Sequence, residues 1–264
     1  MGKRRGGSSD GGNAKKRYKK PTNVLLDPNT SGIYATCNRN KEKACKQELM
    51  LYLQDKIEEL YKVSELEDEE DEDESSVKEE LSIEDKLQQE LNEMKESSKN
   101  KTNLLTPIDI DCECLVFIKT KKPIDPEELV EKVCEESYES TVKRTRYTQK
   151  LSPVMDSCSA SKEELQNLTR RVLARHFHQS EDQKPIKFAI NINKRNFNTL
   201  NKDQMIKAIA ECVGNEHGHK VDLKDYDKLI LVECFKNNIG MSVVNNYQKY
   251  NKYNLQQIYE KKEV

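Results

Sequence analysis

The chain of 264 residues has little apolar and aromatic material from which to build a core. It contains no tryptophan and only 5 phenylalanines, and charged residues (35%) slightly outnumber hydrophobic ones (34%). Spread evenly, this composition would bury too little apolar surface to offset the conformational entropy of the chain. We therefore expect some segments to be disordered and the folded segments to be richer in apolar residues.

The motifs that bind most cofactors are missing as well. Five of the 9 glycines lie in residues 1–22, and there is neither a GxGxxG nor a GxxxxGK(S/T) loop, in which glycine lets the backbone approach a phosphate. A PP-loop pyrophosphatase motif and an acyl-CoA loop of the form (R/Q)xxGx(G/A) are also absent. No apolar run approaches the roughly 18 residues of a membrane span. We predict no cofactor, no small-molecule substrate, no membrane partner and no catalytic activity.

The cysteines and histidines do not form a recognisable metal or disulfide pattern. None of the 8 cysteines is part of a CxxC, so we expect reduced and mostly buried thiols. The histidines fall in two pairs, His176/His178 and His217/His219, whose spacing offers two ligands on one strand face but no evident third. We therefore predict no metal site. The expected location is the nucleus or nucleolus, and also the cytoplasm.

Charge is distributed unevenly along the chain. Residues 1–20 hold 8 Lys/Arg and 1 Asp, or +7, whereas residues 64–100 hold 16 Asp/Glu and 4 Lys, or −12. Because the whole chain carries −2, the remainder carries +3, as expected for a folded body that touches polyanions. We predict a disordered basic tail over residues 1–22 and a disordered acidic insertion over residues 64–103. The alternative for the insertion is a surface that binds a protein partner.

Periodic patterns predict an α/β (α+β) fold. The first unit is expected to have a ferredoxin-like order of strands and helices. Its elements are a short β-like run over 32–37, a helical pattern over 41–62, a period-two pattern over 108–118, a capped helix from Asp125 and a strand over 144–151. In the period-two pattern Cys112 and Cys114 should share one buried face. The second unit should contain a helix over 161–175 with a capping box, a strand over 187–193, a helix over 201–213 ended by Gly214, a central strand over 228–235, a turn at Asn237-Asn238 and a last strand over 239–244. We divide the chain into a tail (1–22), a ferredoxin-like domain (23–140), a second domain (141–247) and a C-terminal tail or short helix (248–264).

Basic and amide side chains gather where three of these strands are expected to end. Arginine and lysine neutralise phosphates, and asparagine reads sugar or base edges. Strand periodicity predicts that Arg144 and Arg146 point to one side, although a merely solvated surface is the alternative. The candidate RNA-binding residues are Lys143, Arg144, Arg146, Lys150, Lys194, Arg195, Asn196, Asn198, Lys236 and Asn237.

At these residues the sequence resembles a known family. The likeness lies in the stretches VKRTRYTQKLSPV, KFAINI, KRNFNT and VDLKDYDKLILVECFKNNIGMSVV, and in LDPNTSGIYATCNRNKEKACKQEL near the start. These stretches are similar to fungal-type THUMP-domain proteins of the tRNA acetylation adaptor group. The likeness covers roughly residues 24–64 and 104–260. It implies that residues 141–247 are a THUMP domain. It also implies that the polar members of the basic segment and of the RNFN segment contact RNA, whereas Phe197 is expected in the core.

The resemblance further implies a function. Such adaptors are needed for N4-acetylcytidine formation in the D-arm of serine and leucine tRNAs. They bind tRNA beside a separate RNA cytidine acetyltransferase, which itself binds acetyl-CoA and ATP. Two alternatives remain open: an RNA-modifying enzyme with an unrecognised site that uses His176, His178 or a cysteine, and an interaction module that works through its acidic insertion.

Overall fold

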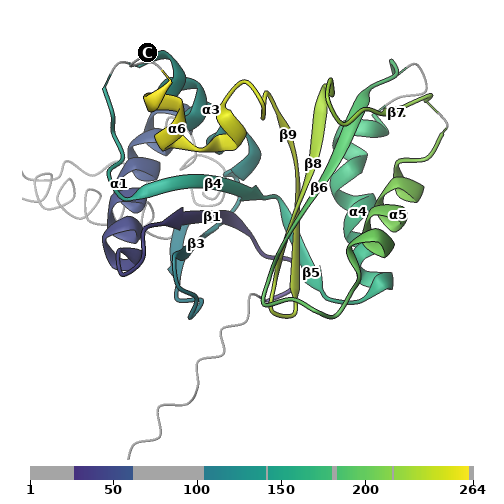
Figure 1. The fold of residues 1–264 in the computed structure, drawn as a ribbon, viewed down its shortest axis with the longest axis horizontal. Coiled ribbons are helices and arrows are strands. Elements are labelled where there is room, and N and C mark those ends of the chain that lie inside the picture. The colour runs from purple at the N-terminus through teal and green to yellow at the C-terminus, as the bar shows by residue number, and fades with distance from the viewer. Residues whose placement is uncertain (1–26, 62–103, 141, 180–182, 216, 262–264) are drawn as a thin grey trace, which may run out of the picture.

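The computed structural model describes residues 27–61, 104–140, 142–179, 183–215 and 217–261 (Figure 1). The predicted basic tail and acidic insertion lie outside the described residues. In chain order the elements are β1 (Ser31–Cys37), α1 (Glu42–Tyr61), β2 (Leu105–Ile108), β3 (Leu115–Thr120), α3 (Pro126–Glu139), β4 (Thr148–Val154), β5 (Asp156–Ser159), α4 (Lys162–Phe177), β6 (Lys187–Arg195), α5 (Lys202–Val213), β7 (Lys220–Val221), β8 (Lys228–Phe235), β9 (Asn238–Asn245), the 3-10 helix η2 (Asn251–Tyr253) and α6 (Leu255–Glu260). No helix in these ranges is long and apolar enough to cross a membrane.

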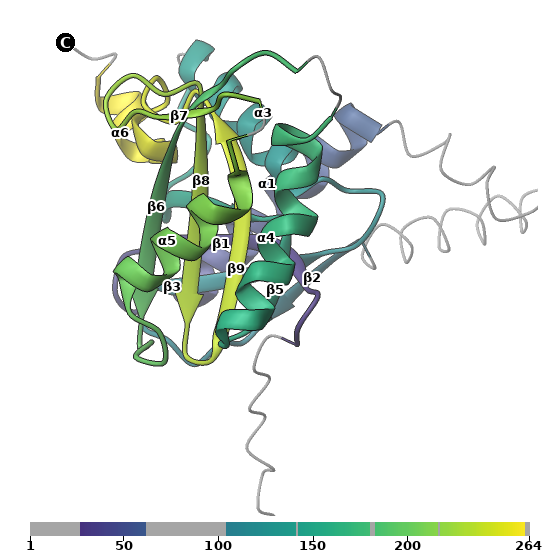
Figure 2. The same cartoon turned by 90° about the vertical axis from the view of Figure 1, so that its right-hand side faces the viewer.

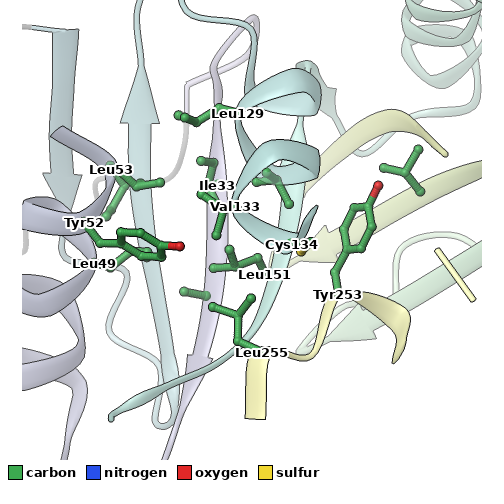
Figure 3. Close-up of a cluster of buried hydrophobic side chains, with 14 of the residues drawn as sticks. Ile33, Leu49, Tyr52, Leu53, Leu129, Val133, Cys134, Leu151, Tyr253 and Leu255 are labelled. Atoms are coloured by element: carbon green, nitrogen blue, oxygen red, sulfur yellow. The ribbon is translucent and has the colours of Figure 1, made fainter. Parts of the chain in front are cut away.

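The first unit is a four-stranded antiparallel sheet in the order β2-β3-β1-β4. With α1 and α3 inserted between its strands, this order is the ferredoxin-like arrangement that the sequence predicts. Side chains of β1 such as Ile33 pack against Leu49 and Leu53 of α1 and Leu129 and Val133 of α3 (Figure 3). The start of α3 also follows its sequence signal, since the Asp125 side chain accepts hydrogen bonds from the first-turn amides.

The predicted single strand over 108–118 is wrong. The chain instead makes an antiparallel hairpin in which Ile108 of β2 pairs with Phe117 of β3. Asp111 (φ 45°) and Cys114 (φ 59°) adopt left-handed conformations in the connection and reverse the chain. Alternation of apolar and acidic residues cannot distinguish one long strand from two short strands joined by such a loop. As a result Cys112 and Cys114 are only partly buried and do not share a core face.

The second unit is a five-stranded sheet in the order β5-β9-β8-β6-β7, with α4 and α5 on one face (Figures 1 and 2). Its helices begin and end as predicted: Ser161 caps α4, Asn201 caps α5, and Gly214 (φ 69°) follows the last turn of α5. The short strands β5 and β7 were not predicted. The turn between β8 and β9 is made by Lys236 (φ 52°) and Asn237, not by Asn237-Asn238 as expected, because Phe235 pairs with Asn238 and draws it into β9.

The central strand β8 joins the two units. Leu229 and Leu231 belong to the same buried cluster as the first unit's sheet, whereas Ile230 and Val232 pack with α4 and α5. The five-stranded sheet is therefore covered on both faces, as the apolar run in its sequence predicts (Figure 1).

Two segments of the chain return to the first unit. Strand β4 pairs with β1 and forms one edge of the first sheet. In sequence, however, β4 follows residue 141, at which we expected the second domain to begin. The C-terminal segment also packs there, because Tyr253 of η2 and Leu255 of α6 are fully buried in the first unit's core (Figure 3).

We predict that Gly240→Ala destabilises the contact between the units. A Cβ at Gly240 of β9 would lie 2.7 Å from Cγ1 of Val154 at the end of β4, which is closer than van der Waals contact allows. Overpacking of this kind should lower the free energy of unfolding by about 1–3 kcal/mol, measured by denaturant titration. In a Val154→Ala background, Gly240→Ala should lower the free energy of unfolding by less. An equal loss in both backgrounds would show that Val154 is not the residue that the added methyl group meets.

Candidate nucleic-acid interface

The end of β6 and the β8–β9 turn lie side by side. Arg195, the last residue of β6, pairs with Phe235, and the backbone N–H of Lys236 donates to the carbonyl of Arg195 over 3.2 Å. Two of the three candidate segments, some 40 residues apart in sequence, thereby form one surface. We call this surface the β6-end group; it comprises Lys194, Arg195, Asn196, Asn198, Lys236 and Asn237.

Phe197 anchors the β6-end group. Its side chain is 3% exposed and packs in the core beneath α4 and α5, which confirms the expected core position. The neighbouring polar side chains of Asn196 and Asn198 are exposed. Nζ of Lys194 donates to the carbonyl of Leu200 over 3.0 Å and lies 5.4 Å from the Phe197 ring centroid. The buried ring therefore fixes the loop while its polar residues stay accessible to solvent.

Lys150 of β4 lies between the two sheets. Its Nζ is 5.6 Å from the ring centroid of Tyr247. Partial burial lowers the pKa of Lys150; the Glu233 carboxylate opposes this shift and the Arg195 guanidinium adds to it. Lys150 is thus an electrostatic neighbour of Arg195 and Glu233, and β4 contributes a partly buried cation to the face of the second sheet that the first unit covers.

The third segment, residues 143–147, forms a separate loop group of Lys143, Arg144 and Arg146. These residues precede β4 and are not a strand, so the side-chain alternation expected from period two is wrong. The reason lies in the hydrogen bonds of the backbone. The Glu48 carboxylate of α1 accepts from the N–H groups of Arg146 and Tyr147, which are thereby unavailable to a strand ladder, and from the N–H of Thr148, where β4 begins.

The candidate cations differ in their partners. Arg144 makes a 2.9 Å ion pair with Glu136, and Lys143 donates to the Gln256 side chain. The remaining basic candidates have no carboxylate within ion-pair distance among the residues that the structure describes; they are Arg146, Lys150, Lys194, Arg195 and Lys236. Cations without a carboxylate partner can bind a phosphate without first breaking an ion pair.

A buried carboxylate that the sequence reasoning missed lies beneath this surface. Glu233 of β8 is 7% exposed and accepts a 2.7 Å hydrogen bond from Nδ2 of Asn193 on β6. Burial raises the pKa of Glu233, partly opposed by the Asn193 hydrogen bond and by the nearby Lys150 charge. The only sequence signal was one acid within the apolar run of β8, and an isolated acid is normally placed on the solvent face.

Three of the four histidines are occupied by hydrogen bonds within the protein. In His219, Nδ1 accepts from the backbone N–H of Ile186 and Nε2 donates to the carbonyl of Phe177, both over 3.0 Å. His176 lies 3.0 Å from the Glu127 carboxylate, and His178 lies 3.2 Å from the carbonyl of Cys212. In the described part of the chain, no group of three or more His, Cys, Asp or Glu side chains could hold a metal ion.

Burial also makes four of the eight cysteines poor nucleophiles. It raises the pKa of Cys37, Cys158 and Cys234 to about 12 in each case, and raises the pKa of Cys134 as well. A nucleophilic cysteine requires the thiolate, so these thiols are inert near neutral pH.

Comparison with known proteins gives a consistent set of relatives. The THUMP domain model matches residues 159–244. A Saccharomyces cerevisiae protein named tRNA acetyltransferase TAN1 is 46% identical over 280 residues, which cover 99% of this chain and 96% of the yeast protein. An uncharacterized Schizosaccharomyces pombe protein is 38% identical over 90% of this chain and 79% of its own length. The solved structure of PH1313 from Pyrococcus horikoshii aligns over 81% of this chain and 55% of that chain with a TM-score of 0.43 and 14% identity, a likeness too distant to indicate function.

We predict that Glu233→Gln stabilises the protein at neutral pH. Burial raises the folded-state pKa of Glu233 above its unfolded value, so the ionised carboxylate opposes folding. The stability of the wild type should therefore fall, relative to the variant, as pH rises above the unfolded pKa of about 4.3 and until the folded pKa is passed. Thermal midpoints measured at about pH 4 and about pH 7.5 should show an advantage for the variant only at the higher pH. A variant less stable than wild type at the higher pH would mean that the charge of Glu233 is needed for folding.

Proposed function

The chain belongs to the THUMP-domain protein family, and we propose that it is a tRNA-binding adaptor that presents tRNA to a separate RNA cytidine acetyltransferase. The reaction it serves is N4-acetylcytidine formation in the D-arm of serine and leucine tRNAs. This choice of RNA rests on the sequence resemblance, and the link to tRNA is supported by the name of the 46% identical yeast relative.

The observation that carries the proposal is the gathering of unpaired cations at the end of the second sheet. Lys194 and Arg195 are the last two residues of β6, Lys236 lies in the adjacent turn, and Lys150 of β4 is an electrostatic neighbour of Arg195. Lysine and arginine attract the phosphate backbone, and the amides of Asn196 and its neighbours can contact sugars or base edges. All ten candidate residues are proposed to contact RNA, with Arg144 and Lys143 contributing least because each already has a partner within the protein.

A second candidate function is acetyl transfer by the chain itself, which the name of the yeast relative, tRNA acetyltransferase TAN1, favours. General acid–base or covalent catalysis needs a positioned base or nucleophile within reach of the substrate. His176 and His219 are instead engaged by side-chain or backbone partners, and burial raises the pKa of most thiols. We therefore favour the adaptor, in which effective concentration and placement of tRNA are the contribution to rate.

We predict that tRNA affinity depends steeply on salt and on the β6-end group. The double variant Lys194→Ala/Arg195→Ala should reduce the slope of log K against log salt by roughly 1.4–1.8, because each lost phosphate contact accounts for roughly 0.7–0.9. Lys207→Ala, which removes an exposed cation from α5, is the matched control and should leave the slope unchanged. Binding that is indifferent to salt between roughly 50 and 200 mM would contradict the proposal.

We predict a strict division of labour in a reconstituted reaction. The chain mixed with tRNA, acetyl-CoA and ATP should yield no acetylcytidine when the digested nucleosides are analysed by mass spectrometry. Addition of the acetyltransferase should yield the product, and the Lys194→Ala/Arg195→Ala variant should lower the yield in proportion to its lost tRNA binding. Acetylcytidine formed without the added enzyme would select the second candidate function.

A further inference from the structure

A single carboxylate of α1 organises the loop group. Oε2 of Glu48 accepts from the backbone N–H of Arg146 over 2.7 Å, and both of its oxygens lie 3.1 Å from the N–H of Tyr147. Oε1 also accepts from the N–H and the Oγ1 hydroxyl of Thr148, each over 2.9 Å. Successive N–H groups that converge on one anion form a nest, and here the anion belongs to the protein.

The other side of the loop is held by α6. The hydroxyl of Tyr259 accepts from the N–H of Arg144 over 3.4 Å, and Nε2 of Gln256 donates to the carbonyl of Thr148 over 3.3 Å. Residues 143–147 thus lie outside the sheet, and their backbone is held by side chains from two helices distant in sequence. Of these contacts, the Glu48 carboxylate provides the shortest and the most numerous.

The arrangement leaves the Arg146 side chain free. Both oxygens of Glu48 face backbone amides, and the Arg146 guanidinium makes no ion pair with any carboxylate of the described residues. It lies instead 5.5 Å from the ring centroid of Tyr147, its neighbour in the nest. A cation adjoining an aromatic ring is a combination that suits an RNA strand, because phosphates attract the cation and bases stack on the ring.

We propose that Glu48 is a positioning residue for RNA binding: its carboxylate fixes the backbone of Arg146 and Tyr147 so that their cation–aromatic pair meets the RNA strand. This inference rests on the proposed function and deepens it. It also predicts that neutralising Glu48 weakens RNA binding, which is the opposite of the change in affinity that the loss of a negative charge alone would cause. Removal of a negative charge from a surface that binds a polyanion should strengthen binding, whereas loss of the positioning contact should weaken it.

The test is Glu48→Gln, which keeps the size of the side chain but replaces one acceptor oxygen with an NH2 group that faces the loop amides. We expect tRNA affinity to fall roughly three- to tenfold and the salt slope to fall by roughly 0.7–0.9, as for loss of one phosphate contact. Asp55→Asn is the matched control, because Asp55 is an exposed acid on the same helix and the change in charge is identical. It should bind tRNA as tightly as wild type or slightly more tightly.

A double-variant cycle separates positioning from a general loss of structure. In an Arg146→Ala background, Glu48→Gln should cost little further affinity, whereas a global effect would add its full cost. Glu48→Asp, which keeps the carboxylate, should bind better than Glu48→Gln. Unchanged or tighter binding by Glu48→Gln, or full additivity with Arg146→Ala, would overturn the inference. Wild-type binding that does not depend on salt would instead overturn the proposed function.

Discussion

The packing of β8 into two cores at once is the constraint on which the rest of the structure depends. Leu229 and Leu231 face the ferredoxin-like unit, while Ile230 and Val232 face α4 and α5. A strand shared in this way makes the two units one body, since neither sheet can shift without opening a buried face to water. Further hydrogen bonds cross the same junction: the hydroxyl of Ser242 donates to the carbonyl of Pro153 over 2.8 Å, and the N–H of Val243 donates to the Glu127 carboxylate. The end of β6, the β8–β9 turn and β4 are consequently held in one fixed geometry.

That fixed geometry explains how the described part of the chain can contribute to a modification reaction by placing tRNA, as we propose. Cations from β4, from the end of β6 and from the neighbouring turn are presented by strands rather than by long loops, so the proposed binding of an extended phosphate backbone costs little conformational entropy. The buried Glu233 side chain accepts a hydrogen bond from Asn193 of β6, and the Glu48 carboxylate accepts from the amides of the separate loop group. These two acidic side chains therefore hold in place the segments that carry the cations. THUMP-domain membership and the proposed adaptor role both fit such a passive, preorganised platform.

Local signals in the sequence predict much of this architecture, and contacts distant in sequence account for what they miss. Capping residues such as Ser161 and Asn201 mark helix starts in the structure, because a cap acts within a few residues. The hairpin around Asp111 was missed because alternation is the same on either side of a reversal. The loop before β4 was taken for a strand because nothing near Arg146 reveals that Glu48, about a hundred residues away, occupies its amides. The grouping of Arg195 with Lys236 follows from the parallel register of β6 and β8, which sequence spacing does not encode.

We propose that RNA contacts the protein where these strands end. Ultraviolet cross-linking of the full chain to tRNA, followed by mass spectrometry of the linked peptides, tests this proposal. We expect cross-links to residues 194–198 and 236–237 and to Tyr147 in the loop group, and few or none to the solvent face of α4 and α5. Cross-links concentrated on α4 and α5, with the β6-end group unlabelled, would contradict it.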